Sequence, residues 1–189
     1  MNDLSLLFAC LLLLVVLGCN DSDDPVIENE EELITDLVYT LLPAAGGPPV
    51  TMTFRDPDGD GGQAPTILVS GPLANNTEYD GSIVLLNSSD PSATENITAE
   101  VREEADDHQF FYIPESSLDV TLAYTDSDND GAPIGITTTL TTGDTSTGNL
   151  RILLRHEPNK SATGVSITDP AAAGGETDIE VTFAVTVSN

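Results

Sequence analysis

One stretch of the sequence decides the fold: residues 177–187 read TDIEVTFAVTV. Every second position in it is apolar, namely Ile179, Val181, Phe183, Val185 and Val187. Because alternate side chains of an extended strand point to opposite faces, this pattern predicts a β-strand with one face in a hydrophobic core. Eight more β-rich runs precede it, separated by clusters of Gly, Pro, Asp and Ser that are typical of turns. The nine expected strands span residues 33–42, 50–55, 66–70, 78–87, 109–113, 118–125, 134–142, 149–156 and 177–187.

These strands, all within residues 33–189, predict one all-β domain, an antiparallel β-sandwich of Ig-like or Greek-key type with about eight or nine strands. Hydrophobic residues make up 39% of the chain, which is enough for a core and argues against disorder throughout. Acidic residues dominate the charge, since 32 Asp and Glu face 5 Lys and Arg, for a formal net charge of −27. A surface of that sign repels phosphates, so we expect no nucleic-acid partner.

Residues 92–108 break the β pattern. Ile97, Val101 and Ala105 recur at every fourth position, which is the spacing of a helix face. Ser92, three residues before Glu95, has the pattern of a capping box at a helix N-terminus. We therefore expect one short helix in a crossover between strands.

Part of the chain also matches itself at an offset of about 70 residues. Residues 50–61, VTMTFRDPDGDG, align with residues 120–131, VTLAYTDSDNDG, and two later dipeptides keep nearly the same offset. The match predicts two repeats, 50–119 and 120–189. The alternative is convergence of two segments in which a strand precedes an acidic turn.

The N-terminus begins with an apolar run. Residues 4–18 are almost all apolar, which is too short for a bilayer core of about 20 residues but the right length for the hydrophobic region of a signal peptide. The run ends in Val16-Leu17-Gly18-Cys19, which resembles the lipobox of bacterial lipoproteins. The resemblance implies that residues 1–18 are removed and that Cys19 becomes the lipidated, membrane-anchored N-terminus. The alternative is a short buried or membrane-spanning helix.

A tether is expected between this anchor and the sandwich. Residues 20–32 hold seven carboxylates, so the segment 19–32 repels itself and stays solvated. Its Ser22-Asp23-Asp24 resembles the surface-export signals of Bacteroidota lipoproteins, which implies an outer-membrane protein exposed at the cell surface. A periplasm-facing lipoprotein and an ordinary charged linker are the alternatives. Because Cys10 lies in the removed segment, the mature chain keeps no free thiol for a Cys-based site.

Two acidic loops are candidate calcium sites. Each follows a strand and has carboxylates at positions 1, 3 and 5 and then a glycine, as in the first half of an EF-hand loop. The bidentate Glu expected at position 12 is replaced by Ile67 and Thr137. The alternative is a pair of solvated acidic turns. The candidate calcium ligands are Asp56, Asp58 and Asp60, before Gly61, and Asp126, Asp128 and Asp130, before Gly131.

A small basic region lies in residues 150–160, LRILLRHEPNK. Strand alternation places Arg151 and Arg155 on one face and His156 on the other. The region predicts a site for an anionic ligand, and the alternative is that these scarce cations only neutralise neighbouring carboxylates. His108 and His156 would also suit a transition metal if the fold brought them together with Asp106, Asp107 or Glu157. The candidate ligand-binding residues are His108, Arg151, Arg155, His156, Glu157 and Lys160.

The sequence contains no nucleophile elbow, phosphate-binding loop or nucleotide-binding fingerprint, so we expect no enzyme activity. Several stretches, among them 31–35 (EELIT), 58–62 (DGDGG) and 155–160 (RHEPNK), resemble a group of small acidic Bacteroidota lipoproteins. Some members are labelled type 1 periplasmic binding fold superfamily proteins, which implies solute capture, whereas the residues here predict an all-β domain. We expect a lipid-anchored binding or structural module with a small-molecule, glycan or protein ligand; the alternative is a solute-binding component of a transport system.

Overall fold

The computed structural model describes residues 33–59 and 62–189. The expected signal peptide, Cys19 and the tether lie outside the described residues, as do Asp60 and Gly61. All described residues belong to one compact unit, which contains every strand and both core clusters. The elements are β1 (Asp36–Pro43), β2 (Val50–Arg55), β3 (Thr66–Val69), β4 (Leu73–Ala74), β5 (Glu78–Leu86), α1 (Ile97–Glu103), β6 (His108–Pro114), β7 (Val120–Tyr124), β8 (Thr137–Thr142), β9 (Ser146–His156) and β10 (Glu176–Ser188).

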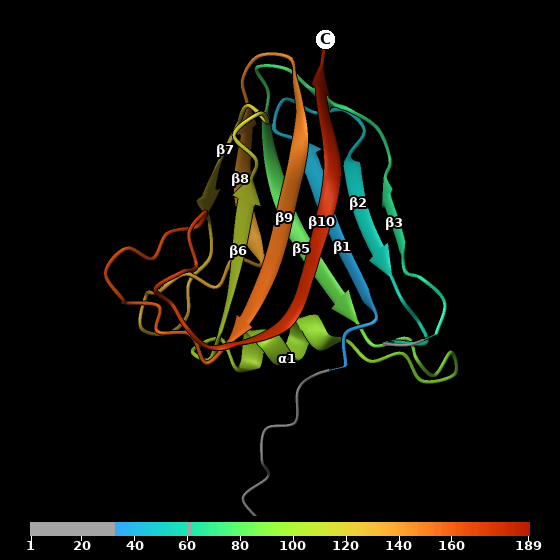
Figure 1. Ribbon diagram of the computed structural model, residues 1–189, viewed down its shortest axis with the longest axis vertical. Coiled ribbons are helices and arrows are strands. Elements are labelled where there is room, and N and C mark those ends of the chain that lie inside the picture. Colours follow the sequence, from blue (N-terminus) through green and yellow to red (C-terminus); the bar gives the residue numbers. More distant parts are fainter. Residues whose placement is uncertain (1–32, 60–61) are drawn as a thin grey trace, which may run out of the picture. The chain divides into compact units, whose positions relative to one another are not determined.

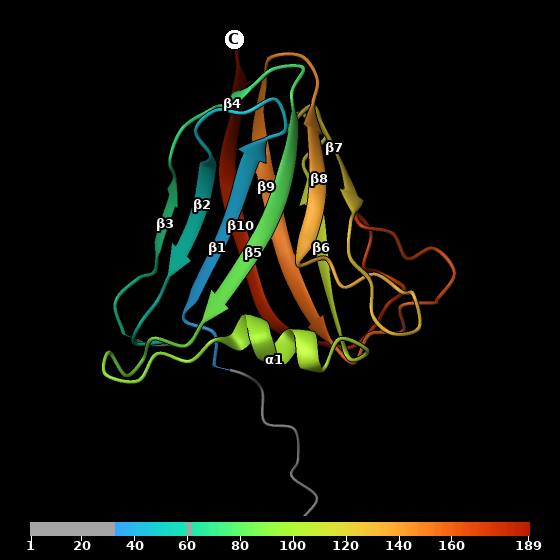
Figure 2. The same ribbon diagram turned by 180° about the vertical axis from the view of Figure 1, so that it is seen from behind.

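Two sheets face each other, which confirms the predicted all-β sandwich (Figures 1 and 2). The six-stranded sheet has the order β3-β2-β1-β5-β8-β7, and the four-stranded sheet has the order β4-β10-β9-β6. Neighbouring strands are antiparallel except for the short pairing of β4 with β10. All nine predicted strands are present, and β4 is the one strand that the sequence pattern did not indicate.

The core lies between the sheets and is rich in aromatic side chains. The alternation predicted for β10 holds, since Val181, Phe183 and Val185 are buried while their neighbours are exposed. Tyr39 of β1 and Tyr112 of β6 meet across the two layers with ring centroids 5.2 Å apart. Burying side chains of this size contributes about 1.5–3 kcal/mol each to stability.

The helix α1 covers one end of the sandwich, and the C-terminus lies at the other end (Figures 1 and 2). Its buried residues include Ile97 and Val101, as the fourfold spacing predicted. The predicted capping box is wrong, because the helix begins after Asn96 without a side-chain cap. Ser92 instead donates to Asp90 through both its backbone N–H and its hydroxyl, which forms a local turn that ends before the helix.

The two acidic loops join neighbouring strands at opposite edges of one sheet. The first connects β2 to β3 and the second connects β7 to β8, so the first part of the predicted repeat adopts the same strand-loop-strand form. Of the two later dipeptide matches, Leu85-Leu86 and Leu153-Leu154 both lie in strands, β5 and β9, whereas Ile97-Thr98 begins α1 and Ile167-Thr168 lies in a loop.

A long loop, residues 157–175, covers the outer face of the four-stranded sheet. There Phe111, Leu153 and Ala173 form a second buried cluster, with Val165 packed against it. No helix in the described part of the chain is long and apolar enough to cross a membrane.

Candidate functional site

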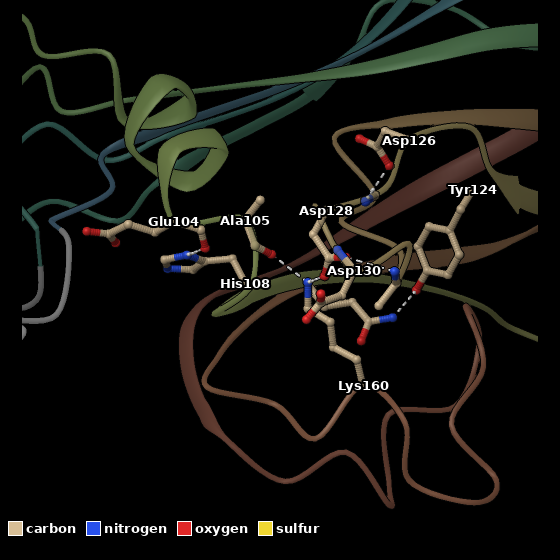
Figure 3. A network of polar contacts seen from close by, with 11 residues as sticks. Glu104, Ala105, His108, Tyr124, Asp126, Asp128, Asp130 and Lys160 are labelled. Atoms are coloured by element: carbon tan, nitrogen blue, oxygen red, sulfur yellow. Dashed lines mark hydrogen bonds and ion pairs between the residues drawn. The ribbon is translucent and has the colours of Figure 1, made fainter.

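The residues singled out from the sequence fall in three places, one of which holds the outer-face arginines, Arg151 and Arg155. His108, His156, Lys160 and the second acidic loop gather at the α1 end of the sandwich (Figure 3). The first acidic loop lies at the far edge of the six-stranded sheet, beside β3. The described candidate aspartates therefore form two separate groups: Asp56 and Asp58 in the first loop, and Asp126, Asp128 and Asp130 in the second.

In the second loop, the carboxylate of Asp126 is occupied by the protein's own backbone. Its Oδ1 accepts from the N–H of Gly135 at 2.7 Å, and its Oδ2 accepts from the N–H of Thr137 at 2.8 Å. Gly135 has a φ of +89°, and a Cβ there would meet the ring of Tyr124 and the Cβ of Phe110, so the position requires glycine. Asp126 thus fixes the path by which the loop enters β8.

Asp128 holds the centre of the same loop. Its Oδ1 accepts from the N–H groups of Asp130 and Ala132, at 3.1 and 2.8 Å, and its Oδ2 accepts from the ammonium of Lys160 at 2.8 Å. Burial opposes ionisation, but hydrogen bonds from Lys160 and the backbone, with the charge of Lys160, lower the pKa of Asp128 below its ordinary value of 3.8. Asp128 is therefore an ionised carboxylate at neutral pH.

Lys160 is the cation of this loop. Its side chain is 6% exposed and that of Asp128 is 3% exposed, so the ion pair is buried. The ammonium also donates to the carbonyl oxygen of Ala105, which follows α1 (Figure 3). Lys160 therefore joins three segments: the end of the helix region, the acidic loop between β7 and β8, and the loop that covers the outer sheet face.

The two histidines are directly opposite each other on β6 and β9. Their rings stack, with centroids 4.8 Å apart and planes inclined by 12°. Since a carbonyl oxygen only accepts, the contact of His108 Nδ1 with the oxygen of Glu104 at 3.1 Å places a proton on Nδ1. The Nε2 of His108 then faces the carboxylate of Asp178, 3.7 Å away.

Asp178 lies beside both histidines, and the sequence pattern did not indicate it as a member of the candidate site. Strict alternation along β10 would place it on the outer face, because Ile179 points into the core. The register shifts between Thr177 and Ile179, and this bulge leaves the Asp178 side chain 1% exposed beside both histidines. The predicted partners Asp106, Asp107 and Glu157 do not take this place. In the described residues, no group of three His, Cys, Asp or Glu side chains is arranged to hold a metal ion.

Arg151 and Arg155, the two arginines among the candidate ligand-binding residues, lie on the outer face of the four-stranded sheet. Arg151 pairs with Glu180 at 3.1 Å, and Arg155 donates to the hydroxyl of Thr177 at 2.7 Å and to the carbonyl of Gly175 at 3.3 Å. His108 and His156 are on the inner face, so the six candidate ligand-binding residues do not converge on one pocket. Arg151 pairs with a carboxylate of the neighbouring strand, whereas Arg155 donates to two uncharged oxygen atoms.

A surface hollow lies at the opposite end from α1. It has a volume of about 670 Å³ and is lined by the loop Pro43–Pro49, by Ser70, Gly71 and Pro72, and by Tyr79. Its lining is mostly apolar and includes none of the residues singled out from the sequence. Comparisons of the chain with protein-family models, curated proteins and solved structures find no match.

Proposed function

We propose that this protein is a lipid-anchored, non-enzymatic β-sandwich of the bacterial cell envelope, displayed from the outer membrane as a binding or structural module. The proposed anchor is Cys19, which lies outside the described residues. Support for it comes from the apolar run and from the Val16-Leu17-Gly18-Cys19 resemblance. The acidic tether, residues 20–32, supplies the spacer between membrane and domain.

One observation favours a module that binds at its surface over an internal solute site. The space between the sheets is filled by Tyr39, Phe110 and Tyr112, which are fully buried. Their polar groups are used inside the protein, because the Tyr39 hydroxyl bonds Thr138 at 2.7 Å and the Tyr112 hydroxyl donates to the carbonyl oxygen of Gly135. A ligand therefore has to bind on the surface of the sandwich.

Calcium stabilisation belongs to this proposal for the first acidic loop only. In the second loop, Lys160 and backbone N–H groups already occupy Asp126 and Asp128. In the first loop, Asp58 accepts from the N–H of Gln63 at 2.8 Å, and its carboxylate is exposed. An exposed carboxylate pays little desolvation cost when it binds a cation.

A second candidate function is solute capture at the hollow of about 670 Å³. Its volume falls in the range of small-molecule sites, and its prolines hold the lining rigid. Because β1 begins at the α1 end, the chain enters the domain at the end opposite this hollow (Figure 1). A stabilising small molecule whose effect is lost on replacing Gly71 with a large residue would favour this candidate.

The anchor is tested by expressing the full chain with Cys19→Ser in a bacterium fed labelled palmitate. We expect the wild type to incorporate palmitate and to sediment with membranes, and Cys19→Ser to do neither. Cys10→Ser is the matched control, because it removes the other cysteine of the chain and lies in the segment that is removed. Equal labelling of Cys19→Ser and the wild type would contradict the anchor.

A further inference from the structure

A pocket of about 510 Å³ lies between the helix α1 and the outer face of β5, and we call it the α1 pocket. Figure 2 shows α1 against the end of β5. The hydroxyl of Thr98 joins the two elements, because it accepts from the N–H of Leu85 at 2.7 Å and donates to the Leu85 carbonyl oxygen at 3.2 Å. The walls are therefore fixed by the fold, and the volume is that of a small-molecule site. The lining includes Ser82, Val84 and Leu86 of β5, and Thr94, Asn96 and Arg102.

Arg102 differs from the other basic residues of the chain. The four others, Arg55, Arg151, Arg155 and Lys160, each contact an oxygen atom of a neighbouring segment. Within the part of the chain that the structure describes, the Arg102 guanidinium contacts no carboxylate and makes no hydrogen bond, and its side chain is exposed at the pocket. In a chain with 32 acids and 5 bases, this cation stays available to an anionic ligand.

The chemistry of Arg102 and the charge of the chain together select the anion. A guanidinium presents a planar fork of N–H donors that matches a carboxylate or a phosphate. The net charge of −27 repels each negative charge that a ligand carries. A singly charged carboxylate is therefore favoured over a doubly charged phosphate.

The rest of the lining suits hydroxyl groups. The side chains of Ser82, Thr94 and Asn96 are exposed and make no hydrogen bond within the described residues. Asn96 stands at the N-cap position of α1, but its amide does not cap the helix. Glu95 accepts from the amide of Asn87 through Oε2 at 2.9 Å, which leaves Oε1 as an acceptor. These groups offer both donors and acceptors to a ligand with several hydroxyls.

The pocket has opposite charges at its two ends. Arg102 lies in the last turn of α1 and Glu95 lies before the first turn, and a helix of seven residues is about 10 Å long. This separation orients a ligand with its carboxylate at Arg102 and its hydroxyls toward Glu95. We propose that the α1 pocket binds a sugar acid, a small ligand with one carboxylate and several hydroxyl groups. The assignment rests on the proposed function as a surface-binding module and names the ligand class of that module.

The test is an NMR titration of the nitrogen-15-labelled chain from Asn20 onward, which contains the whole described unit. The probe is sodium glucuronate, with sodium chloride at matched ionic strength as the blank. We expect the amide signals of Ser82, Thr94 and Asn96 to shift and saturate with a Kd of about 1 mM, since exposed polar groups bind weakly. Glucose lacks the carboxylate and acetate lacks the hydroxyls, so each should bind about tenfold more weakly or worse.

Variants separate the pocket from the net charge. Arg102→Gln should weaken glucuronate binding about tenfold or more, because it removes the charge-assisted hydrogen bonds. Arg151→Gln is the matched control, since it removes the same charge from an arginine that already pairs with Glu180. Ala99→Leu fills the pocket from the exposed side of α1 without changing the charge, and it should also weaken binding about tenfold or more. Circular dichroism of each variant checks that the sandwich is intact.

Three results would overturn the proposal. One is the absence of a saturable shift up to about 20 mM glucuronate, well above the expected Kd. Another is equal weakening by Arg102→Gln and Arg151→Gln, which would reflect net charge alone. The third is tighter binding of glucose 6-phosphate than of glucuronate, which would assign the pocket to a phosphate. Because the chain from Asn20 lacks Cys19, a failure here is distinguishable from a failure of the proposed anchor, which palmitate labelling reports.

Discussion

Replacing Lys160 with methionine removes the ammonium from the buried pair with Asp128 and keeps most of the side-chain volume. The Asp128 carboxylate would then stay 3% exposed with two backbone N–H donors and no opposing charge. Breaking a buried ion pair on one side costs about 3–5 kcal/mol, and the two remaining donors place this case near about 3 kcal/mol. For a domain of this size that loss corresponds to a fall in Tm of about 6–12 °C.

The assay is urea unfolding followed by far-ultraviolet circular dichroism or tyrosine fluorescence, because the chain has no tryptophan. Arg151→Met is the control, since it removes a cation from an exposed pair in which Arg151 is 39% and Glu180 is 45% exposed. That change should cost at most about 1 kcal/mol. The double variant Lys160→Met/Asp128→Asn should recover much of the loss, because no buried charge is then left unpaired.

The same pair gives a pH dependence with a definite sign. Because the pKa of Asp128 is lowered by folding, its contribution is fully present above the ordinary value of 3.8 and is lost as the pH falls below it. The difference in free energy of unfolding between the wild type and Lys160→Met should be full at about pH 6 and shrink below 3.8. Two results would contradict a stabilising Lys160–Asp128 ion pair. One is a loss of unfolding free energy in Lys160→Met no larger than in Arg151→Met, and the other is a loss that is the same at low and neutral pH.

Two other predictions concern the acidic loops and the buried tyrosines. Millimolar calcium should shift the Tm of the wild type and of Asp130→Asn equally, because Asp126 and Asp128 of the second loop already bond backbone N–H groups and Lys160. A smaller shift in Asp130→Asn, seen by calorimetry, would show that this loop binds calcium. Burial raises the pKa of the Tyr39, Tyr112 and Tyr124 phenols, so an absorbance titration should show these three ionising only with unfolding, above the ordinary value of 10.0. Three phenols that titrate reversibly near 10 in the folded chain would disagree with their burial.

Most strands were predictable because their signal is local. Alternation along 177–187 fixed which residues of β10 enter the core, and only the two-residue β4 is too short to show a period. The helix was predictable from the spacing of Ile97 and Val101, but its start was not, since Ser92 forms a turn with Asp90 in place of a cap. Local competition between side-chain hydrogen bonds decides such boundaries.

The candidate site depended on contacts that are distant in the sequence. Spacing predicted a loop in which Asp126 and Asp128 converge on a cation. In the structure Asp128 pairs with Lys160, 32 residues away, and Asp126 accepts from backbone N–H groups. Asp178 joins the histidines only because a bulge reverses its direction, and alternation predicts the opposite. Bulges and long-range pairs depend on the packing of whole sheets, so they leave no periodic signal along the chain.

The burial of Lys160 has a practical consequence for locating the protein in a cell. It is the single lysine of the sequence, and in the folded chain its amine is held between Asp128 and the carbonyl of Ala105. If the N-terminal amine is acylated at Cys19, as proposed, the native protein presents no reactive primary amine. Labelling of intact cells with amine-reactive biotin would then miss it even when it is fully displayed, so an antibody against the exposed sandwich is the reagent that reports its position.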